Sequence, residues 1–264
     1  MKIKPFDRLS FHCEVRVSAV QALRSKSFLL SALSFYVIIT GSVILEVYSY
    51  TLDGGILSSN RYFDILARTI SSESVIFFSP ILASLVMAGV YVDDLKTGYI
   101  KFFIMRVTRK SYIFARIIGC FLAGALVLSL GMFAAIFLST VIAACIDKTS
   151  TILCVGAYNM KQLLILLLFY FITGGLWSVT GLVCSAIMES RVIAYCSPFI
   201  VFYFLIILNE RFFPAFYIIS PKEWLNSSIY WNSESMYTVI VILVILITLI
   251  TTFRLLAMRR LKQL

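Results

Sequence analysis

Few residues of this 264-residue chain could perform acid–base, nucleophilic or metal chemistry, and none has the spacing that such chemistry needs. His12 is the single histidine, and no second histidine or nearby carboxylate cluster accompanies it. The sequence contains no H-E-x-x-H and no G-x-S-x-G, the motifs of zinc and serine hydrolases. It also lacks the G-x-x-x-x-G-K-[ST] loop that holds nucleotide phosphates. We therefore expect no catalytic residue, no bound cofactor and no metal site in this chain.

The cysteines give no metal or redox motif either. No C-x-x-C occurs among Cys13, Cys120, Cys145, Cys154, Cys184 and Cys196. Cys145 and Cys154 flank one short loop and could form a disulfide in an oxidising compartment. Unpaired thiols are the alternative, and it is the one that we favour.

The residues that could mediate an interaction are concentrated in the segment 93–110. Acidic and basic side chains are mixed there with Tyr99, Ile100, Phe102, Phe103, Ile104 and Met105. A loop that only reverses the chain can be short and polar, whereas this composition is typical of a short helix that docks into a partner. Apolar residues that lie in the membrane interface would give the same composition, so both interpretations stay open at this point.

The elements that must position these residues are predicted by hydropathy. Apolar residues make up 61% of the chain and charged residues 14%, against about 45–50% and about 25% in soluble proteins. The mean hydropathy of +0.96 is typical of an integral membrane protein. Six uncharged runs are long enough to cross about 30 Å of hydrocarbon: Phe28 to Val47, Val75 to Val92, Tyr112 to Cys145, Leu163 to Met188, Val192 to Leu208 and Tyr237 to Phe253. We therefore expect an all-α polytopic fold in the plasma membrane, as a single domain over 1–264.

The distribution of basic residues predicts the orientation and accounts for most of the net charge of +10. The N-terminal segment, residues 93–116, Arg191 and the C-terminal segment together hold 17 of the 23 Lys and Arg residues. Basic residues accumulate in cytoplasmic connections, so both termini are expected in the cytoplasm. The third run is longer than the bilayer core requires, and its first turns, which carry Arg116, are therefore also expected in the cytoplasm.

The segment 10–26 before the first run is predicted to form an amphipathic helix with Ser10 as its N-cap. Its apolar stripe is Phe11, Val15, Ala19, Ala22 and Leu23. A helix of this kind directly before a membrane span is expected to lie in the headgroup layer. A cytoplasmic helix packed on a partner subunit is the alternative. On the outer side, Asn60 to Ile70 is expected to contain a short helix.

The predicted spans differ from those of ion-coupled carriers. Spans four to six contain no ionisable residue, and span three contains none beyond Arg116. Carriers driven by protons or sodium usually bury such groups on their pathway, so the sequence disfavours a secondary transporter. Span four carries small residues at three- to four-residue steps, which allow close helix packing or line a pathway: Gly174, Ser178, Gly181 and Ser185.

The arrangement of these features resembles the permeases of ATP-binding cassette exporters of the type-2 family. The matching motif begins with an acidic residue after span two and a glycine four residues later, Asp94 and Gly98. An apolar segment, a Thr-Arg pair and a basic residue entering span three follow, at Thr108, Arg109 and Arg116. The family often has proline two residues before the Thr, where this chain has Arg106. The tight inner turn from Glu189 to Arg191 and the outer segment 209–235 also fit.

The resemblance implies a function and a set of partners. Residues 93–110 would form the coupling helix that docks on a separate cytoplasmic ATPase subunit, which would bind the ATP and magnesium. Residues assigned to coupling on this basis are Asp94, Gly98, Phe102, Phe103, Met105, Arg106, Thr108, Arg109, Glu189 and Arg191. Segment 209–235 would be a re-entrant or interfacial segment. The chain would pair with a second copy or a homologue to form the substrate pathway, and it would not itself be an enzyme.

The substrate class follows from composition only in outline. The absence of buried charge and the abundance of Phe and Tyr favour an amphipathic or apolar substrate, such as a peptide or a lipid-like molecule, over an inorganic ion. The alternative function is a membrane anchor or immunity-type protein that binds a partner without transporting anything. An ATPase that copurifies and is needed for turnover would distinguish the two.

Overall fold

The structure is a computed structural model, and it describes residues 5–52, 68–70, 72–100, 108–146, 160–212, 220–226 and 233–263. Within these ranges every regular element is an α-helix and there is no strand. Five helices are long and apolar enough to cross a membrane. They are α2 (Lys26–Leu52), α7 (Arg109–Ile146), α9 (Met160–Met188), α10 (Arg191–Phe212) and α12 (Ser233–Gln263). The chain is therefore all-α, with the architecture of a multi-pass membrane protein.

The predicted second span is not one continuous helix. It consists of α4 (Glu73–Ser84) and α5 (Val90–Lys96), which are separated by a turn at residues 85–89. Gly89 lies at the end of this turn, where a Cβ atom would come within 2.7 Å of the Tyr195 hydroxyl oxygen on α10. A larger residue at this position would require the Tyr195 side chain to shift. The sequence predicted a single span from Val75 to Val92. The break was missed because no residue in this run is charged and most of them are apolar.

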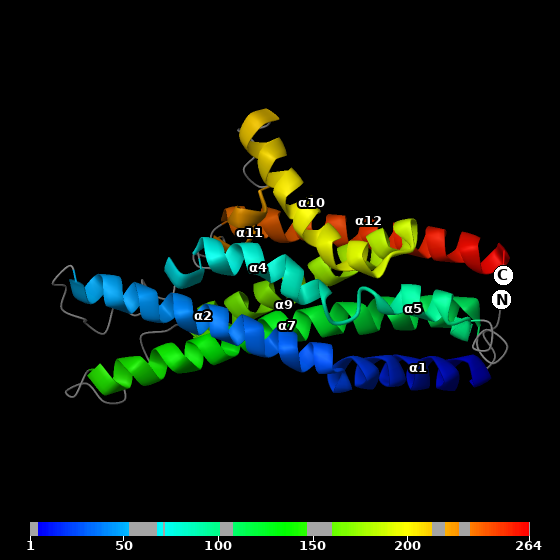
Figure 1. The fold of residues 1–264 in the computed structure, drawn as a ribbon, viewed down its shortest axis with the longest axis horizontal. Helices are drawn as coiled ribbons and strands as arrows, with labels where there is room; N and C mark the ends of the chain where they lie inside the picture. Colours follow the sequence, from blue (N-terminus) through cyan, green and yellow to red (C-terminus); the bar gives the residue numbers. More distant parts are fainter. Residues whose placement is uncertain are drawn as a thin grey trace.

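Helix α9 is the central helix of the bundle and packs against α4, α7, α10 and α12 (Figure 1). A Cβ atom on Gly124 of α7 would lie 2.6 Å from the Gly174 carbonyl oxygen and 2.4 Å from Cβ of Ser178. One on Gly181 would lie 2.6 Å from the Ala194 carbonyl oxygen of α10. Ser185 is also buried. In the described structure, the small residues of span four therefore lie inside the bundle, where they allow close helix packing.

Helix α1 (Pro5–Arg24) lies along the first turns of α7 (Figure 1). It begins at Pro5, so the prediction of Ser10 as its N-cap is wrong. Proline is favoured in the first helical turn because its missing N–H would have no partner there. The helix ends at a break, where the Ser25 hydroxyl donates to the Ala22 carbonyl at 2.8 Å and accepts from the Phe28 N–H at 3.1 Å. The headgroup-layer location of this helix stays a prediction.

The predicted apolar stripe of α1 coincides only in part with the face that packs on the bundle: Ala22 is buried, Val15 and Ala19 are half-buried, and Leu23 is exposed. The buried side chains of its described part are Glu14, Ser18 and Ala22, whereas Leu23 is exposed. The interface with α7 is polar because α7 presents Ser111 and Arg116 to it. Three apolar side chains of α1 are exposed: Val17, Val20 and Leu23.

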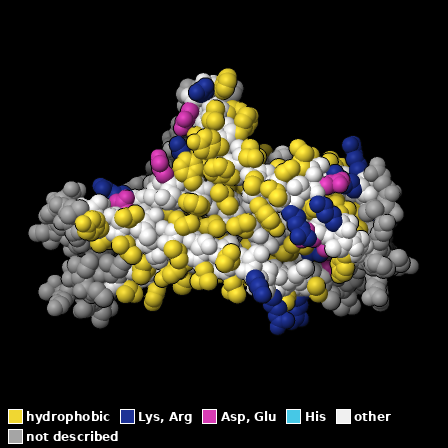
Figure 2. Space-filling model, viewed as in Figure 1, with side chains coloured by type: hydrophobic (Ala, Val, Ile, Leu, Met, Phe, Trp, Pro, Cys, Tyr) yellow, Lys and Arg dark blue, Asp and Glu magenta, His cyan; other side chains and the backbone are white. Residues whose placement is uncertain are grey.

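Helix α2 separates its apolar residues into two faces. One face, with Phe28, Phe35, Ile39 and Val43, is buried against the bundle. The other is exposed and carries Leu29, Leu30, Leu33 and Val37. Figure 2 shows exposed hydrophobic side chains across the middle of the molecule, with Lys and Arg gathered toward one end. An uncovered apolar belt of this kind is expected of a surface that faces lipid.

The short helix α11 (Pro221–Asn226) belongs to the predicted outer segment. Its Trp224 is buried and stacks on Trp177 of α9, with ring centroids 5.9 Å apart. Lys222 pairs with Glu210 at 3.4 Å and so joins α11 to the end of α10. Residues 213–219 and 227–232 lie outside the described ranges, as does most of the predicted outer helix at 60–70.

Candidate functional site

One end of the bundle holds α1, α5, the start of α7, the α9–α10 connection and the last turns of α12 (Figure 1). We call it the basic end, because several Lys and Arg side chains are exposed there: Arg16, Arg24, Lys26, Lys96, Arg109, Lys110 and Arg259. Three ion pairs hold this end together, and we call them the ion-pair cluster. They are Asp94 with Arg116, Asp93 with Arg191, and Glu189 with Arg260. Most of the residues that the sequence assigned to coupling and that the structure describes lie here.

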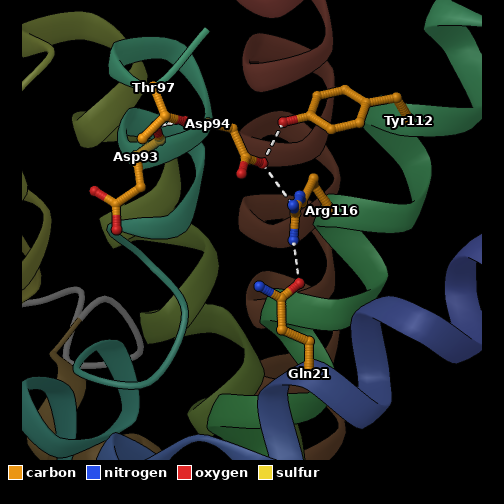
Figure 3. A network of polar contacts seen from close by, with 6 residues as sticks. All are labelled: Gln21, Asp93, Asp94, Thr97, Tyr112 and Arg116. Carbon is orange, nitrogen blue, oxygen red and sulfur yellow. Dashed lines mark hydrogen bonds and ion pairs between the residues drawn. The ribbon is translucent and has the colours of Figure 1, made fainter. Parts of the chain in front are cut away.

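The buried pair of the cluster joins three helices (Figure 3). Arg116 Nη2 of α7 lies 2.5 Å from Asp94 Oδ2 of α5, and both side chains are about nine-tenths buried. The Tyr112 hydroxyl donates to the same Asp94 oxygen at 2.7 Å. Arg116 Nη1 donates to Gln21 Oε1 of α1 at 3.1 Å. Asp94, which lies in the last turn of α5, is therefore linked to α7 and, through Arg116, to α1.

The neighbouring carboxylate connects α5 to a fourth helix. Asp93 pairs with Arg191, the first residue of α10, and this pair is partly exposed. The Thr97 hydroxyl donates to the Asp93 backbone carbonyl at 2.7 Å and helps to end α5. Gly98 then takes a left-handed conformation with φ of 70°. Glycine adopts this conformation without strain, which explains its place directly after the helix.

The third pair closes the connection between α9 and α10 onto α12. This connection is only Glu189 and Ser190, as short as the sequence indicates. Glu189 pairs with Arg260 of α12, and Arg260 also donates to the Ile187 carbonyl at 3.2 Å. Glu189 has φ of 51°, a left-handed conformation that is costly for a residue with a Cβ atom. The strain at this position is accompanied by a side-chain contact that glycine could not make.

A second buried carboxyl lies between α1 and α7. Glu14 Oε2 accepts a hydrogen bond from the Ser111 hydroxyl at 2.8 Å, whereas Glu14 Oε1 is buried without a partner among the described residues. Burial raises the pKa of the Glu14 carboxyl, and the Ser111 hydrogen bond opposes that rise. Burial likewise raises the pKa of the Asp94 carboxyl, and the guanidinium of Arg116 opposes it. The polar contacts at this end therefore enclose two carboxyls that burial disfavours as anions.

Only some of the predicted coupling residues lie in the ion-pair cluster. Asp94, Glu189 and Arg191 belong to the ion-pair cluster, Gly98 follows α5, and the Thr108 hydroxyl accepts from the Ser111 N–H at 3.4 Å at the start of α7. Arg109 is exposed. Phe102, Phe103, Met105 and Arg106 lie outside the described residues.

Sequence reasoning missed the partners of these residues. Arg116 was expected in a cytoplasmic turn and as the basic residue of the motif that enters span three, but without a partner, and Tyr112, Gln21 and Arg260 were not assigned any role. The spacing of Tyr112 and Arg116 is a usable signal, because residues four apart share one face of a helix. The identity of their partner, Asp94, depends on how α5 packs and is not visible in the pattern.

In the half of the bundle away from the basic end, the described residues form no comparable polar site. A small pocket is present in this half. It is lined by apolar side chains and by two hydroxyl-bearing residues, Thr69 and Tyr170. The space is too tight to admit a water molecule. The Tyr170 hydroxyl is fully buried and lacks a hydrogen-bond partner in the described structure. This pocket is therefore not a preformed binding site for a large substrate.

No cluster of three or more histidine, cysteine or carboxylate residues that could hold a metal ion occurs among the described residues. Comparison with known proteins adds no identification, because no protein-family model matches the sequence and no curated protein matches it significantly.

Proposed function

We propose that this chain is the permease subunit of an ATP-driven exporter of the type-2 ATP-binding cassette family. In this proposal the basic end faces the cytoplasm, and a separate ATPase subunit docks on residues 93–110. The interrupted segment formed by α4 and α5 acts as the sixth crossing. The chain forms the substrate pathway together with a second copy or a homologue.

The observation that carries the proposal is the attachment of the docking segment to the rest of the bundle. Asp93 and Asp94 lie in the last turn of α5, just before the 97–108 connection, and are paired with α10 and α7. Thr108 ends the connection, and Arg109 begins α7, the longest described helix. A force applied to the connection would therefore act on α5, α7 and α10 together. This is the mechanical requirement for a segment that transmits the movement of an ATPase to a membrane domain.

Two further observations agree with a pathway shared between copies. The interior of the described bundle is closely packed, with glycine contacts between α7 and α9 and a pocket that excludes water. The candidate spans contain few ionisable residues, and Arg116 is paired at the basic end rather than at mid-membrane depth. Transport would therefore proceed by rearrangement of helix bundles, and the substrate would be amphipathic or apolar, such as a peptide or a lipid-like molecule.

The docking hypothesis is tested by replacing two aromatic residues of the segment. Phe102→Ala with Phe103→Ala removes two anchors, and loss of a buried aromatic anchor costs about 2 kcal/mol or more at an interface. Affinity for the ATPase should fall at least about 30-fold, since every 1.4 kcal/mol is tenfold. The partner would be identified by mass spectrometry of chains that copurify with the permease, and its affinity measured in detergent.

A matched control replaces two exposed aromatic residues of the apolar belt, Phe133→Ala with Phe204→Ala. This control should insert normally and keep its affinity for the ATPase. Unchanged association after replacement of Phe102 and Phe103 would contradict the docking site.

The energy source is tested separately. In vesicles that contain both subunits, transport should require hydrolysable ATP and should survive collapse of the proton and sodium gradients. Transport by this chain alone, abolished by a protonophore and indifferent to ATP, would refute the proposal. A permease that binds a partner but shows no ATP-dependent transport would favour the alternative, a non-transporting membrane anchor or immunity-type protein.

A further inference from the structure

The junction of α1 and α2 is a fixed structure at the surface of the basic end. The Ser25 hydroxyl bonds to backbone groups on both sides of the break, to Ala22 and Phe28. Phe28 is buried against the bundle and anchors the start of α2. Arg24 and Lys26, on either side of Ser25, are exposed. Their positions relative to the two helices are therefore set by hydrogen bonds and by core packing.

Lys26 lies at the head of an exposed apolar stripe. Leu30, Leu33 and Val37 follow it at steps of four, three and four residues, which places all four side chains on one face of α2. The three apolar side chains are 62–68% exposed. On the other side of Ser25, Leu23 and Val20 of α1 are also exposed. Apolar surface thus continues along both helices, and the two basic residues lie where the helices meet.

The charge of this junction is not compensated within the described structure. The acidic side chains of the basic end that the structure describes are engaged elsewhere: Asp93 with Arg191, Asp94 with Arg116, Glu189 with Arg260, and Glu14 with Ser111. No ion pair of Arg24 or Lys26 occurs among the described residues. Basic side chains lie over this junction in the space-filling view, next to hydrophobic ones (Figure 2). The junction therefore presents two exposed basic side chains next to apolar surface, a combination that is complementary to an anion carrying apolar surface.

We propose that the α1–α2 junction binds an anionic phospholipid. Arg24 and Lys26 hold the phosphate and the negative headgroup, and one acyl chain lies along Leu30, Leu33 and Val37. Charged headgroup and hydrocarbon are joined in such a lipid in the same order as the basic pair and the apolar stripe on the protein. An acidic protein surface would satisfy the charges but would leave the stripe of α2 uncovered. The inference concerns the permease alone and does not depend on an ATPase.

The test uses the full chain reconstituted in phosphatidylcholine vesicles with a spin-labelled lipid. The association constant of labelled phosphatidylglycerol relative to labelled phosphatidylcholine is measured by electron paramagnetic resonance. The wild-type protein should prefer phosphatidylglycerol, and the preference should weaken as salt concentration rises. Arg24→Gln with Lys26→Gln should lower the relative constant at least about fivefold, which corresponds to about one basic contact near an anionic surface.

Two control variants make the result specific. Arg24→Lys with Lys26→Arg keeps both charges and should retain the preference. Arg68→Gln with Arg211→Gln removes two exposed basic residues elsewhere and should leave the preference unchanged. An equal loss in this last variant would reveal a general charge effect and overturn the proposal.

Two other results would also overturn it. A wild-type protein without preference for phosphatidylglycerol would show that the junction is covered by something else, such as a second copy of the chain. If the double Gln variant kept the lipid preference but lost affinity for the ATPase, the junction would be a protein-binding surface. Neither result would bear on ATP-driven transport, which is tested with the 93–110 segment and not with this junction.

Discussion

Breaking the buried pair between Asp94 and Arg116 should destabilise the basic end strongly. Arg116→Met removes the cation and leaves a carboxylate that is about nine-tenths buried and keeps its hydrogen bond from the Tyr112 hydroxyl. Removal of one partner from a buried ion pair typically costs 3–5 kcal/mol, because the other charge stays desolvated and unpaired. We therefore expect the free energy of unfolding to fall by about 3 kcal/mol or more.

The complementary variant, Asp94→Asn, should cost less. Asparagine keeps an oxygen that can accept the Tyr112 hydrogen bond, and the longer Arg116 side chain keeps its bond to Gln21 and can turn toward solvent. The double variant, with Met at 116 and Asn at 94, contains no buried charge. Its loss of stability should be smaller than the sum of the two single losses by about 2 kcal/mol, a typical coupling for groups in direct contact.

The measurement is equilibrium unfolding of the purified protein in mixed micelles of a mild and a denaturing detergent. The four proteins of the cycle are compared under identical conditions. Losses that add to within about 0.5 kcal/mol would show that the two side chains do not interact, and would refute the buried pair as the link between α5 and α7.

Three more predictions concern stability and use the same unfolding measurement. Glu14→Gln should stabilise the protein at neutral pH, because burial raises the pKa of Glu14 and a neutral amide can still accept the Ser111 hydrogen bond. In the wild-type protein, the stability lost by burying the charged carboxylate should be recovered as the pH falls to the ordinary carboxyl range. Glu189→Gly should be about 1 kcal/mol more stable than Glu189→Gln, because both lose the charge contact with Arg260 and only glycine relieves the positive φ. Gly124→Ala should cost about 1–3 kcal/mol, because its Cβ has no space against α9.

Each of these has a result that would contradict it. A Glu14→Gln protein whose advantage did not vary with pH would show that Glu14 is not a buried, titrating group. Equal stability of the two Glu189 variants would remove the argument for strain. The control for Gly124 is Gly41→Ala, because no atom lies within 4 Å of a Cβ there. This change should be neutral or stabilising, and a loss as large as that of Gly124→Ala would contradict the packing argument.

The positions of five spans could be predicted from the sequence, because long uncharged runs leave few alternatives to a buried helix. The break in the second span could not, since no residue of the run is charged and the contact of Tyr195 with Gly89 comes from a helix about a hundred residues later. The face of α1 was predicted only in part, since Ala22 is buried as expected and Leu23 is exposed. Hydrophobic periodicity selects the most apolar face, whereas α1 packs through Glu14 and Ser18 on polar groups of α7.

The candidate site was predictable in part. The sequence singles out Asp94 and Arg116 individually, and Glu189 and Arg191 as a tight turn. Their pairing was not predictable, because charges in a membrane protein were interpreted as markers of orientation. Arg116 satisfies both roles, since it lies at the basic end and is also buried in a specific contact.

The turn between α4 and α5 restricts which helices can separate from one another. Residues 85–89 form a turn between the two helices, and Val86, Met87 and Ala88 are nearly inaccessible. The turn keeps backbone hydrogen bonds from the Leu85 N–H to the Ile81 carbonyl and from the Ala88 N–H to the Ser84 carbonyl, and surrounding protein covers it. Tyr195 supplies part of that cover at Gly89, and the Ser84 hydroxyl contacts the Tyr195 carbonyl at 3.3 Å. We therefore expect the first turns of α10 to move together with α4 and α5 in a conformational change, and the boundary between moving bodies to lie elsewhere in the bundle.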